Sequence, residues 1–367
     1  MAEKQSFNVG VIGYGLSASV FHIPFITTTP SLTLHSILQR KPSDSSSAPR
    51  DYPDLKHHTS LDTLLADAEL DVVVVTTPPE THFPFTRAAL EAGKHVFVEK
   101  PFVPSVAEAD ELIRLAESQH RRVCVYQNRR WDSDFLTVRR LLAEGRLGRV
   151  VEFETHFDRY RAAAPTNWKG ALRTAQGGGP LYDLGSHLLD QAYALFGMPV
   201  GVFAKLVSQR DGALVGPANP DLEPDSVNIT MTYADGMIAH VRIGVLSVET
   251  RQPRFWIRGT KASYHKHGLD TQEPQLRAGM KTSDPEFGRE PPECDGKLMV
   301  MGNEGQVSEE NCPNVVPETY GKIYELFAQS LSGKGDVPVP ATQARDVLRI
   351  IEAARESAKT CREIQLS

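Results

Sequence analysis

Strand-like and helix-like segments alternate through the first third of the chain, and no other feature of the sequence constrains the fold as strongly. Apolar runs typical of strands occur at residues 7–15, 32–38, 71–79, 95–102 and 122–128. Helix-like patterns lie between several of them, at residues 61–70, 82–93 and 105–119. Repeated strand-then-helix units predict a parallel sheet with helices on both faces. Because the runs are continuous rather than alternating, we expect strands that are buried on both sides.

The pattern changes after about residue 130, where we expect a second domain. Strand-like segments then follow one another with mostly short connections, at residues 150–161, 200–210, 225–236, 237–246 and 254–267. This succession predicts an antiparallel sheet. Helices are predicted at residues 131–148 and 341–360. Surface loops are predicted at residues 41–53, which are rich in serine and proline, and at residues 270–318, which are rich in proline, glycine and charge.

Composition narrows the class of protein. A chain of 367 residues is too long for one ordinary core, so two domains are expected. With 40% apolar and 23% charged residues and a net charge of −6, the chain gives no reason to expect nucleic acid or a membrane as a partner. Four scattered cysteines indicate neither a zinc site nor a disulfide framework. No segment is long and apolar enough to span a bilayer, and we expect a cytoplasmic protein.

A glycine motif, GYGLSA, follows the first predicted strand. Gly13 would permit a tight turn, Gly15 would let the backbone approach a pyrophosphate, and Ala18 would allow close helix packing. The N-terminus of the next helix would then present free N–H groups to the phosphates. We therefore predict a dinucleotide-binding (Rossmann) domain, with Tyr14, Leu16 and Ser17 also near the cofactor. The alternative is a tight turn with a purely structural role.

The end of the second predicted strand indicates which dinucleotide is bound. NAD sites of this type place an acid there for the ribose 2′-hydroxyl. Here Gln39, Arg40 and Lys41 follow the strand, and the first acid is Asp44. A guanidinium and an ammonium would attract a 2′-phosphate, so we favour NADP over NAD. A solvated basic loop is the alternative.

A third motif, GGGPLYDLGSHLLDQAYALFG at residues 177–197, carries groups suited to proton transfer. Asp183, His187 and Asp190 follow i, i+4, i+7 spacing and would share one face of a helix. A carboxylate one turn away could orient an imidazole that titrates near neutral pH. Two alternatives stay open: a solvated helix start with His187 exposed, and a metal site. No second ligand cluster with credible spacing occurs, so no metal is predicted.

The chain resembles the Gfo/Idh/MocA (glucose–fructose oxidoreductase/inositol dehydrogenase) family in three motifs taken together. These are GYGLSA, the strand-end EKP of Glu99, Lys100 and Pro101, and D-x-G-x-H within the third motif. The resemblance runs from Asn8 to about Leu366. The segments VYQNRRWDSDFLTVRRL, DRYR and GMPVGVFAKLVSQRDGA look most like the NADP-dependent scyllo-inositol dehydrogenases of that family.

The resemblance implies an α/β fold with three parts. An N-terminal Rossmann domain with a parallel sheet would cover residues 1–127, and a substrate-binding and oligomerisation α/β domain with an open, mainly antiparallel sheet would cover residues 128–340. A C-terminal helix and tail, residues 341–367, would pack back on the body. In this family the Lys–Pro bond of the EKP motif is often cis, which would apply to Lys100 and Pro101.

The same resemblance assigns roles to individual residues. It implies Lys100, Asp183 and His187 as the catalytic residues, which also bind substrate. Further cofactor contacts are implied for Thr76, Thr77, Pro78, His82, Glu99, Asn128 and Trp168. Asn128, Tyr160 and Arg173 would contact the substrate.

We therefore predict an NADP-dependent oxidoreductase that interconverts a secondary alcohol of a cyclitol or sugar-like polyol and its ketone. His187, oriented by Asp183, would take the hydroxyl proton as hydride leaves, and Lys100 would stabilise the developing alkoxide. A homodimer or homotetramer is expected. Two alternatives stay open: a reductase of another carbonyl or dihydrodiol substrate, and a non-enzymatic nucleotide-sensing regulator.

Overall fold

The computed structural model describes residues 6–302 and 304–366, and it divides into two compact units. The first unit comprises Met1–Asn128, Gln272–Phe287 and Glu318–Arg345. The second unit comprises Arg129–Thr271, Gly288–Pro317 and Asp346–Ser367. Residues 1–5 of the predicted Rossmann domain and residue 367 of the predicted tail lie outside the described residues.

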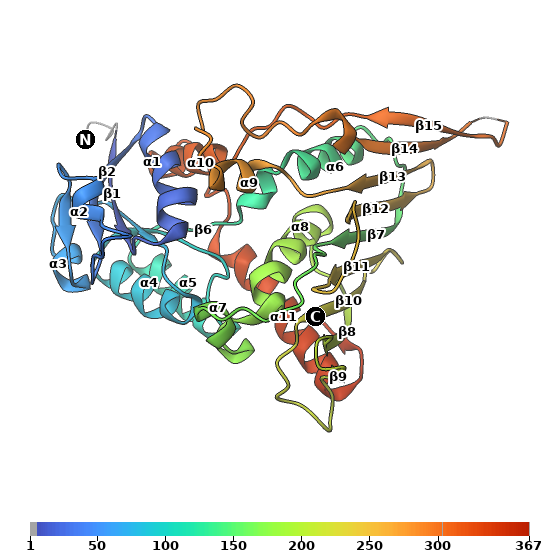
Figure 1. The fold of residues 1–367 in the computed structure, drawn as a ribbon, viewed down its shortest axis with the longest axis horizontal. Coiled ribbons are helices and arrows are strands. Elements are labelled where there is room, and N and C mark those ends of the chain that lie inside the picture. The colour runs from blue at the N-terminus through green and yellow to red at the C-terminus, as the bar shows by residue number, and fades with distance from the viewer. Residues whose placement is uncertain (1–5, 303, 367) are drawn as a thin grey trace. The chain divides into compact units, whose positions relative to one another are not determined.

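The first unit is built on a six-stranded parallel sheet in the order β3-β2-β1-β4-β5-β6 (Figure 1). Its strands are β1 (Phe7–Ile12), β2 (Leu32–Leu38), β3 (Lys56–His58), β4 (Val72–Val75), β5 (His95–Val98) and β6 (Val123–Val125). All four residues of β4 are buried, because helices cover both faces of the sheet. The prediction of a parallel sheet with continuous apolar strands is confirmed.

Helices flank this sheet on both sides (Figure 1). α4 (His82–Glu91) and α5 (Val106–Ser118) lie on one face, and α1 (Ile23–Thr28) and α10 (Gly321–Leu331) lie on the other. The first unit also contains α2 (Ala48–Asp51), α3 (Leu61–Leu65), α9 (Gln272–Arg277), the π-helix η1 (Ser17–His22) and the 3₁₀ turn η2 (Pro79–Thr81).

The second unit contains a ten-stranded mixed sheet, with the path β15-β14-β13-β12-β7-β11-β10-β8-β16 and with β9 paired to β8. Its strands are β7 (Val150–His156), β8 (Gly201–Ser208), β9 (Ala213–Leu214), β10 (Ser226–Thr232), β11 (Ile238–Ile243), β12 (Pro253–Gly259), β13 (Ala262–His267), β14 (Gly296–Met301), β15 (Val307–Cys312) and β16 (Ile364–Gln365). Only the β7–β11 pair is parallel among the described strands of this sheet, so the prediction of a mainly antiparallel sheet is confirmed.

The longer helices of the second unit lie on one side of this sheet, and its other face is open (Figure 1). They are α6 (Ser133–Ala143), α8 (Ser186–Phe196) and most of α11 (Ala341–Thr360). The short elements are α7 (Trp168–Ala171), the π-helix η5 (Leu181–Gly185) and the 3₁₀ turns η3 (Asn128–Trp131), η4 (Thr174–Gln176) and η6 (Pro292–Cys294). Burial alternates along β8 and β10, as one covered face requires.

Three sequence predictions need correction. The region 270–318 is not only loop, because it contains α9, β14 and β15. The predicted strand 254–267 is two strands, β12 and β13, joined by a turn at 260–261. The predicted loop 41–53 contains the short helix α2, and the edge strand β3 that follows was not predicted.

No helix in the described part of the chain combines the length and the apolar character needed to cross a bilayer. The four cysteines are free, and Cys124 and Cys312 are buried.

Candidate active site

The turn after β1 has the geometry that the glycine motif predicts. Gly13 has φ +97°, which favours glycine, and a Cβ there would lie 3.0 Å from Thr76 Oγ1. A Cβ at Gly15 would meet nothing within 4 Å, so the space over this residue is open. Backbone at Gly15 can therefore be approached closely by a ligand.

A cavity of about 630 Å³ opens beside this turn, within the size range of small-molecule sites. Its lining comes mainly from the ends of β1 and β2 and from the residues that follow β1, β2 and β4, at the carboxyl ends of parallel strands. Leu61, which follows β3, completes it. The order of strands in the chain reverses between β1 and β4, which is where open α/β sheets bind ligands. The lining residues are Ile12, Gly13, Tyr14, Gly15, Leu38, Gln39, Arg40, Lys41, Leu61, Thr77, Pro78, Thr81 and Phe85.

Arg40 and Lys41 give this cavity its charge. Both are exposed, and neither side chain has a hydrogen bond or ion pair with any residue that the structure describes. The lining contains no aspartate or glutamate. The cavity therefore offers two cations to an anionic ligand group.

Gln39 lines the cavity, and its side-chain amide also makes hydrogen bonds within the neighbouring loop. Its side-chain Nε2 donates to the Ser46 carbonyl at 2.9 Å, and its Oε1 accepts from the Ala48 N–H at 2.8 Å. Ser46 Oγ in turn donates to the Tyr14 carbonyl at 2.9 Å. The amide of Gln39 thus braces the loop that carries Arg40 and Lys41.

Tyr14 packs on the same loop. Its hydroxyl donates to Asp51 Oδ2 at 2.9 Å. Burial, with the bond to the Asp51 carboxylate added, raises the pKa of Tyr14 above its usual range. The phenol therefore stays protonated, as its role as a donor requires.

Glu99 and Lys100 follow β5 directly, at the carboxyl edge of the same sheet. The Glu99 carboxylate accepts hydrogen bonds from Ser17 Oγ, from His22 Nε2 at 3.0 Å and from the Lys100 N–H at 3.0 Å. Burial opposes ionisation of Glu99, but the bonds from His22 and Ser17 and the nearby charges outweigh it and lower the pKa to about 2. Glu99 is therefore a carboxylate at neutral pH. The Lys100–Pro101 peptide bond is cis.

The cofactor contacts that were predicted after β4 differ in their positions. Thr77 and Pro78 line the cavity, whereas Thr76 Oγ1 donates to the Ile12 carbonyl at 2.9 Å beneath it. His82 is buried, and its ring nitrogens lie 2.7 Å from the Thr77 carbonyl and 2.8 Å from the Pro101 carbonyl. His82 thus ties together the two segments that follow β4 and β5.

In the second unit, Asp183 and His187 lie on consecutive helical segments. Asp183 is in the π-helix η5, and His187 is in the first turn of α8. The segment that carries the pair is helical, as predicted, but its first turn is a π-turn. His187 is only 5% exposed, so the alternative of an exposed histidine is wrong. Asp183 is half-buried and accepts from Lys169 Nζ at 3.1 Å through both oxygens.

Asp190, the second acid of that motif, has a structural role. Its carboxylate is 1% exposed and accepts two hydrogen bonds from Arg130, at 2.8 and 2.7 Å. Burial raises the pKa of Asp190, and Arg130 opposes this shift. The pair joins the start of the second unit to α8.

The remaining predicted residues differ in exposure. Asn128, the last residue of the first unit, is buried at the start of η3. Trp168 is 50% exposed, with the Lys169 ammonium 5.7 Å from its ring centre. Tyr160 and Arg173 are exposed; the Tyr160 backbone bridges to Leu246, and Arg173 precedes η4. Tyr160, Trp168 and Arg173 are thus available to a ligand.

A buried ionic network lies elsewhere in the second unit. Arg254, fully buried, bonds Asp134 Oδ2 at 2.8 Å, Thr155 Oγ1 at 2.8 Å and Gln191 Oε1 at 2.7 Å. Lys266 Nζ bonds Glu290 Oε2 at 2.7 Å. The network contains the carboxylates of Asp132, Asp134, Asp270 and Glu290 and the cations Arg129, Arg254 and Lys266. Carboxylates outnumber cations, and burial with the neighbouring acids raises the pKa of Asp132.

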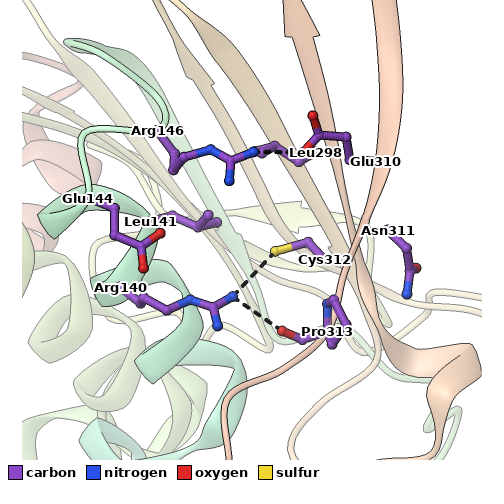
Figure 2. Close-up of a pocket in the computed structure, with 9 residues that line it drawn as sticks. All are labelled: Arg140, Leu141, Glu144, Arg146, Leu298, Glu310, Asn311, Cys312 and Pro313. Carbon is purple, nitrogen blue, oxygen red and sulfur yellow. Dashed lines mark hydrogen bonds and ion pairs between the residues drawn. The ribbon is translucent and has the colours of Figure 1, made fainter.

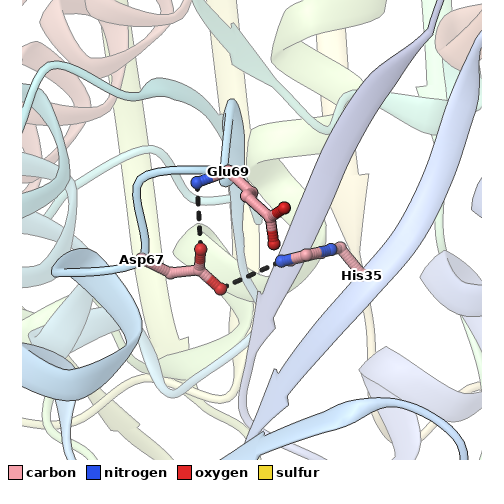
Figure 3. A group of neighbouring side chains, drawn as sticks. All are labelled: His35, Asp67 and Glu69. Carbon is pink, nitrogen blue, oxygen red and sulfur yellow. Dashed lines mark hydrogen bonds and ion pairs between the residues drawn. The ribbon is translucent and has the colours of Figure 1, made fainter.

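A second cavity and a group of possible metal ligands are less suited to binding a ligand, because the charged groups that would hold it already have partners. A cavity of about 240 Å³ beside β14 and β15 contains Arg140 and Arg146, but both guanidinium groups are engaged (Figure 2). Arg146 pairs with Glu310 at 2.7 Å, and Arg140 bonds the Pro313 carbonyl at 3.4 Å. Figure 3 shows three possible metal ligands, His35, Asp67 and Glu69. There the Lys56 ammonium already contacts both carboxylates, at 3.0 and 2.6 Å.

Comparison with known proteins decides the family. The model described as "Oxidoreductase family, NAD-binding Rossmann fold" matches residues 7–127, and the model described as "Oxidoreductase family, C-terminal alpha/beta domain" matches residues 139–366. The chain belongs to the Gfo/Idh/MocA oxidoreductase family. It is therefore an oxidoreductase with an NAD-binding Rossmann domain, as the motifs predicted.

Several Gfo/Idh/MocA relatives match along the whole chain. The scyllo-inositol 2-dehydrogenase (NADP(+)) IolW of Bacillus subtilis is 37% identical, over 99% of this chain and 97% of its own. An uncharacterized oxidoreductase of Schizosaccharomyces pombe is 40% identical, over 97% of this chain and 98% of its own. The solved structure of yvaA from Bacillus subtilis superposes with a TM-score of 0.92 at 35% identity, and each chain is covered completely.

Several residues in and around the candidate site were not predicted from the sequence. Leu61, Thr81 and Phe85 line the cavity, and their place just after β3 and β4 could have indicated them. Lys169, His22 and Tyr324 carry no such signal, because each acts on a residue that is distant in the sequence.

Proposed function

We propose that the protein is an NADP-dependent dehydrogenase that interconverts a secondary alcohol of a cyclitol or polyol and the corresponding ketone. The observation that carries this proposal is the cavity beside the glycine turn, where Arg40 and Lys41 have no acidic neighbour in the lining. A 2′-phosphate on the adenosine ribose would occupy a site of this charge. The similarity to an NADP(+)-dependent scyllo-inositol 2-dehydrogenase supports the same choice.

Three residues are proposed to carry the reaction, as the sequence analysis inferred. His187 takes the proton from the substrate hydroxyl in the oxidation and returns it in the reduction. Asp183 orients the imidazole and stabilises its protonated form. Lys100 donates a hydrogen bond to the reacting oxygen and stabilises its developing negative charge. Bound NADP⁺ supplies the hydride acceptor.

Glu99 is proposed to bind the hydroxyls of the nicotinamide ribose. Its carboxylate is ionised and lies at the carboxyl end of β5, next to Lys100. An ionised carboxylate accepts hydrogen bonds only, which suits the hydroxyl donors of a ribose. The exposed side chains of Tyr160, Trp168 and Arg173 are proposed to contact the nicotinamide and the substrate hydroxyls.

A substrate panel with matched variants tests the proposal. The unaltered protein should oxidise inositols with NADP⁺, or reduce inosose ketones with NADPH, and the panel should include sugars, glucosides and simple ketones. Lys100→Met and His187→Gln should each lower kcat at least about 100-fold while NADPH binding changes little. Asp190→Asn serves as a control for general damage near α8, because Asp190 is paired with Arg130.

Two outcomes would contradict the proposal. Turnover confined to NAD(H) would remove the cofactor assignment, and full activity in the Lys100 or His187 variant would remove the catalytic one. Binding of NADPH without turnover of any alcohol or carbonyl would favour a nucleotide-sensing protein instead.

We also propose a homo-oligomer, a dimer or a tetramer. The open face of the ten-stranded sheet exposes large apolar side chains, with Trp256 49% and Ile238 40% exposed. A second copy of the chain could cover this face. Light scattering after size-exclusion chromatography should give twice or four times 40.5 kDa, and Trp256→Glu should lower that mass.

A further inference from the structure

A buried hydrogen-bond chain leads from α10 to the carboxylate of Glu99, entirely within the first unit. Tyr324 Oη lies 2.6 Å from His22 Nδ1, and His22 Nε2 lies 3.0 Å from Glu99 Oε1. Ser17 Oγ donates to the same oxygen of Glu99. His22 is fully buried and Tyr324 is 1% exposed, so bulk water does not compete for these bonds.

The π-helix η1 brings two of these donors to one carboxylate. Ser17 begins η1 and His22 ends it. A π-helix closes its hydrogen bonds between residues i and i+5, so its first and last residues here lie one turn apart. In a regular α-helix, with 3.6 residues per turn, positions five apart point in different directions. The wide turn therefore lets both side chains reach Glu99.

The chemistry of Glu99, His22 and Tyr324 indicates which atom of each hydrogen bond carries the hydrogen. A carboxylate only accepts, so the hydrogen between His22 and Glu99 is on His22 Nε2. In the tautomer that carries its hydrogen on Nε2, Nδ1 accepts, and the Tyr324 hydroxyl is then the donor. Burial raises the pKa of Tyr324 well above its usual value, so the phenol keeps its proton.

Aromatic rings enclose the imidazole and hold it in place. The Tyr126 ring centre is 4.4 Å from that of His22, and Phe97 and Tyr324 follow at 6.1 and 6.2 Å. Tyr324 also stacks on Phe97 at 4.8 Å. The imidazole therefore has a single orientation, in which one nitrogen faces Tyr324 and the other faces Glu99.

We propose that His22 and Tyr324 are positioning residues of the dinucleotide site, which hold the Glu99 carboxylate ionised and in one orientation for the hydroxyls of the nicotinamide ribose. The inference rests on the proposed function, because it uses the contact between Glu99 and that ribose. Both residues are buried, and neither lines the cavity. Each acts through the hydrogen bond that it makes to its neighbour in the chain.

Comparing the affinities for two ligands distinguishes a positioning role of His22 and Tyr324 from a general effect on the fold. NADPH contains the nicotinamide ribose, whereas 2′,5′-ADP contains only the adenosine half. Tyr324→Phe deletes one hydroxyl and keeps the ring packing, and His22→Asn removes the imidazole. Each variant should raise the Kd of NADPH about tenfold and change the Kd of 2′,5′-ADP less than twofold, as measured by fluorescence titration and calorimetry.

Tyr126→Phe is the matched control. Tyr126 belongs to the same aromatic cluster, but its hydroxyl donates to the Phe21 carbonyl at 2.9 Å rather than to His22 or Glu99. This variant should leave both affinities unchanged. Circular dichroism and thermal unfolding of all three variants would report any loss of fold.

The outcomes decide the inference separately from the proposed function. It is overturned if Tyr324→Phe changes neither affinity, weakens both ligands equally, or has no greater effect than Tyr126→Phe. If the unaltered protein prefers NADH, the NADP assignment fails. The role of His22 and Tyr324 is then tested by the same comparison made with NADH and ADP. If the protein binds no dinucleotide, both proposals fall.

Discussion

The Lys169 ammonium lies 3.1 Å from both carboxylate oxygens of Asp183. Asp183 is one of the three residues proposed to carry the reaction, and Lys169 lies one residue after the exposed Trp168 in α7. The ion pair therefore links an exposed segment to a carboxylate that is proposed to be catalytic. Lys169 partly neutralises the negative charge of Asp183.

Removing Lys169 should change the pH dependence of the reaction more than the stability of the fold. The side chain is 48% exposed, and exposed ion pairs contribute about 1 kcal/mol or less. In Lys169→Met the unshielded Asp183 would favour a protonated imidazole. The apparent pKa in the kcat–pH profile should therefore rise, by about half a unit. Steady-state rates of ketone reduction between pH 5.5 and 9 would measure it.

Lys169→Arg is the control for this prediction, since it retains the charge. Its profile should match that of the unaltered protein. A profile that is unchanged in Lys169→Met, or that moves to lower pH, would show that the ion pair has no influence on the proton transfer.

The basic pair should set the choice between the two nicotinamide cofactors. Replacing Arg40 and Lys41 together by serine removes both cations from the cavity lining. The Kd of NADPH should rise at least about 100-fold, because each charged contact to a phosphate contributes about 1.5–3 kcal/mol and the variant removes two of them. The Kd of NADH should change less than about threefold. Fluorescence titration with both cofactors gives the two values.

A matched double variant, Arg114→Ser with Lys281→Ser, removes the same charge from the first unit. Both of these side chains are exposed, and neither lines the cavity. If this variant weakens NADPH as much as the first one does, long-range charge explains the effect, and the assignment of Arg40 and Lys41 fails.

The buried ionic network should make stability depend on pH. Glu290 faces Lys266 at 2.7 Å and Ser133 Oγ at 3.1 Å, and burial, with the charges of Asp134 and Asp270 added, raises its pKa from 4.5 to about 7. Between these values the folded state holds a proton that the unfolded state has released. This contribution to stability is therefore complete below pH 4.5 and is lost as the pH rises toward 7.

Glu290→Gln should remove that slope. The free energy of unfolding of the unaltered protein should fall by about 1–2 kcal/mol more than that of the variant between pH 5.5 and 7.5. Urea unfolding at the two pH values measures it. Glu293→Gln, at an exposed carboxylate, should keep the slope of the unaltered protein. Parallel pH dependences for Glu290→Gln and the unaltered protein would contradict the assignment.

Local patterns in the sequence were enough for most of the fold. The predicted helix 341–360 matches α11, Ala341–Thr360, because its apolar positions recur with the helical period. The strand β4 was predicted from four consecutive valines. By contrast, β15 was missed, since five of its six residues are exposed and its pattern resembles that of a loop. Hydrogen bonds to β14 hold it, and those depend on the partner strand.

The sequence by itself determined the glycine turn, the basic residues after β2 and the charged end of β5, because each is a short motif whose geometry follows from neighbouring residues. Tertiary structure alone decided that Tyr324 lies against His22, 302 residues away in the chain, and that Lys169 pairs with Asp183. No local pattern encodes such contacts. They arise only when packing of the helices and sheets brings distant side chains within hydrogen-bonding distance. Between Tyr324 and His22, which are buried, exclusion of water also strengthens the bond.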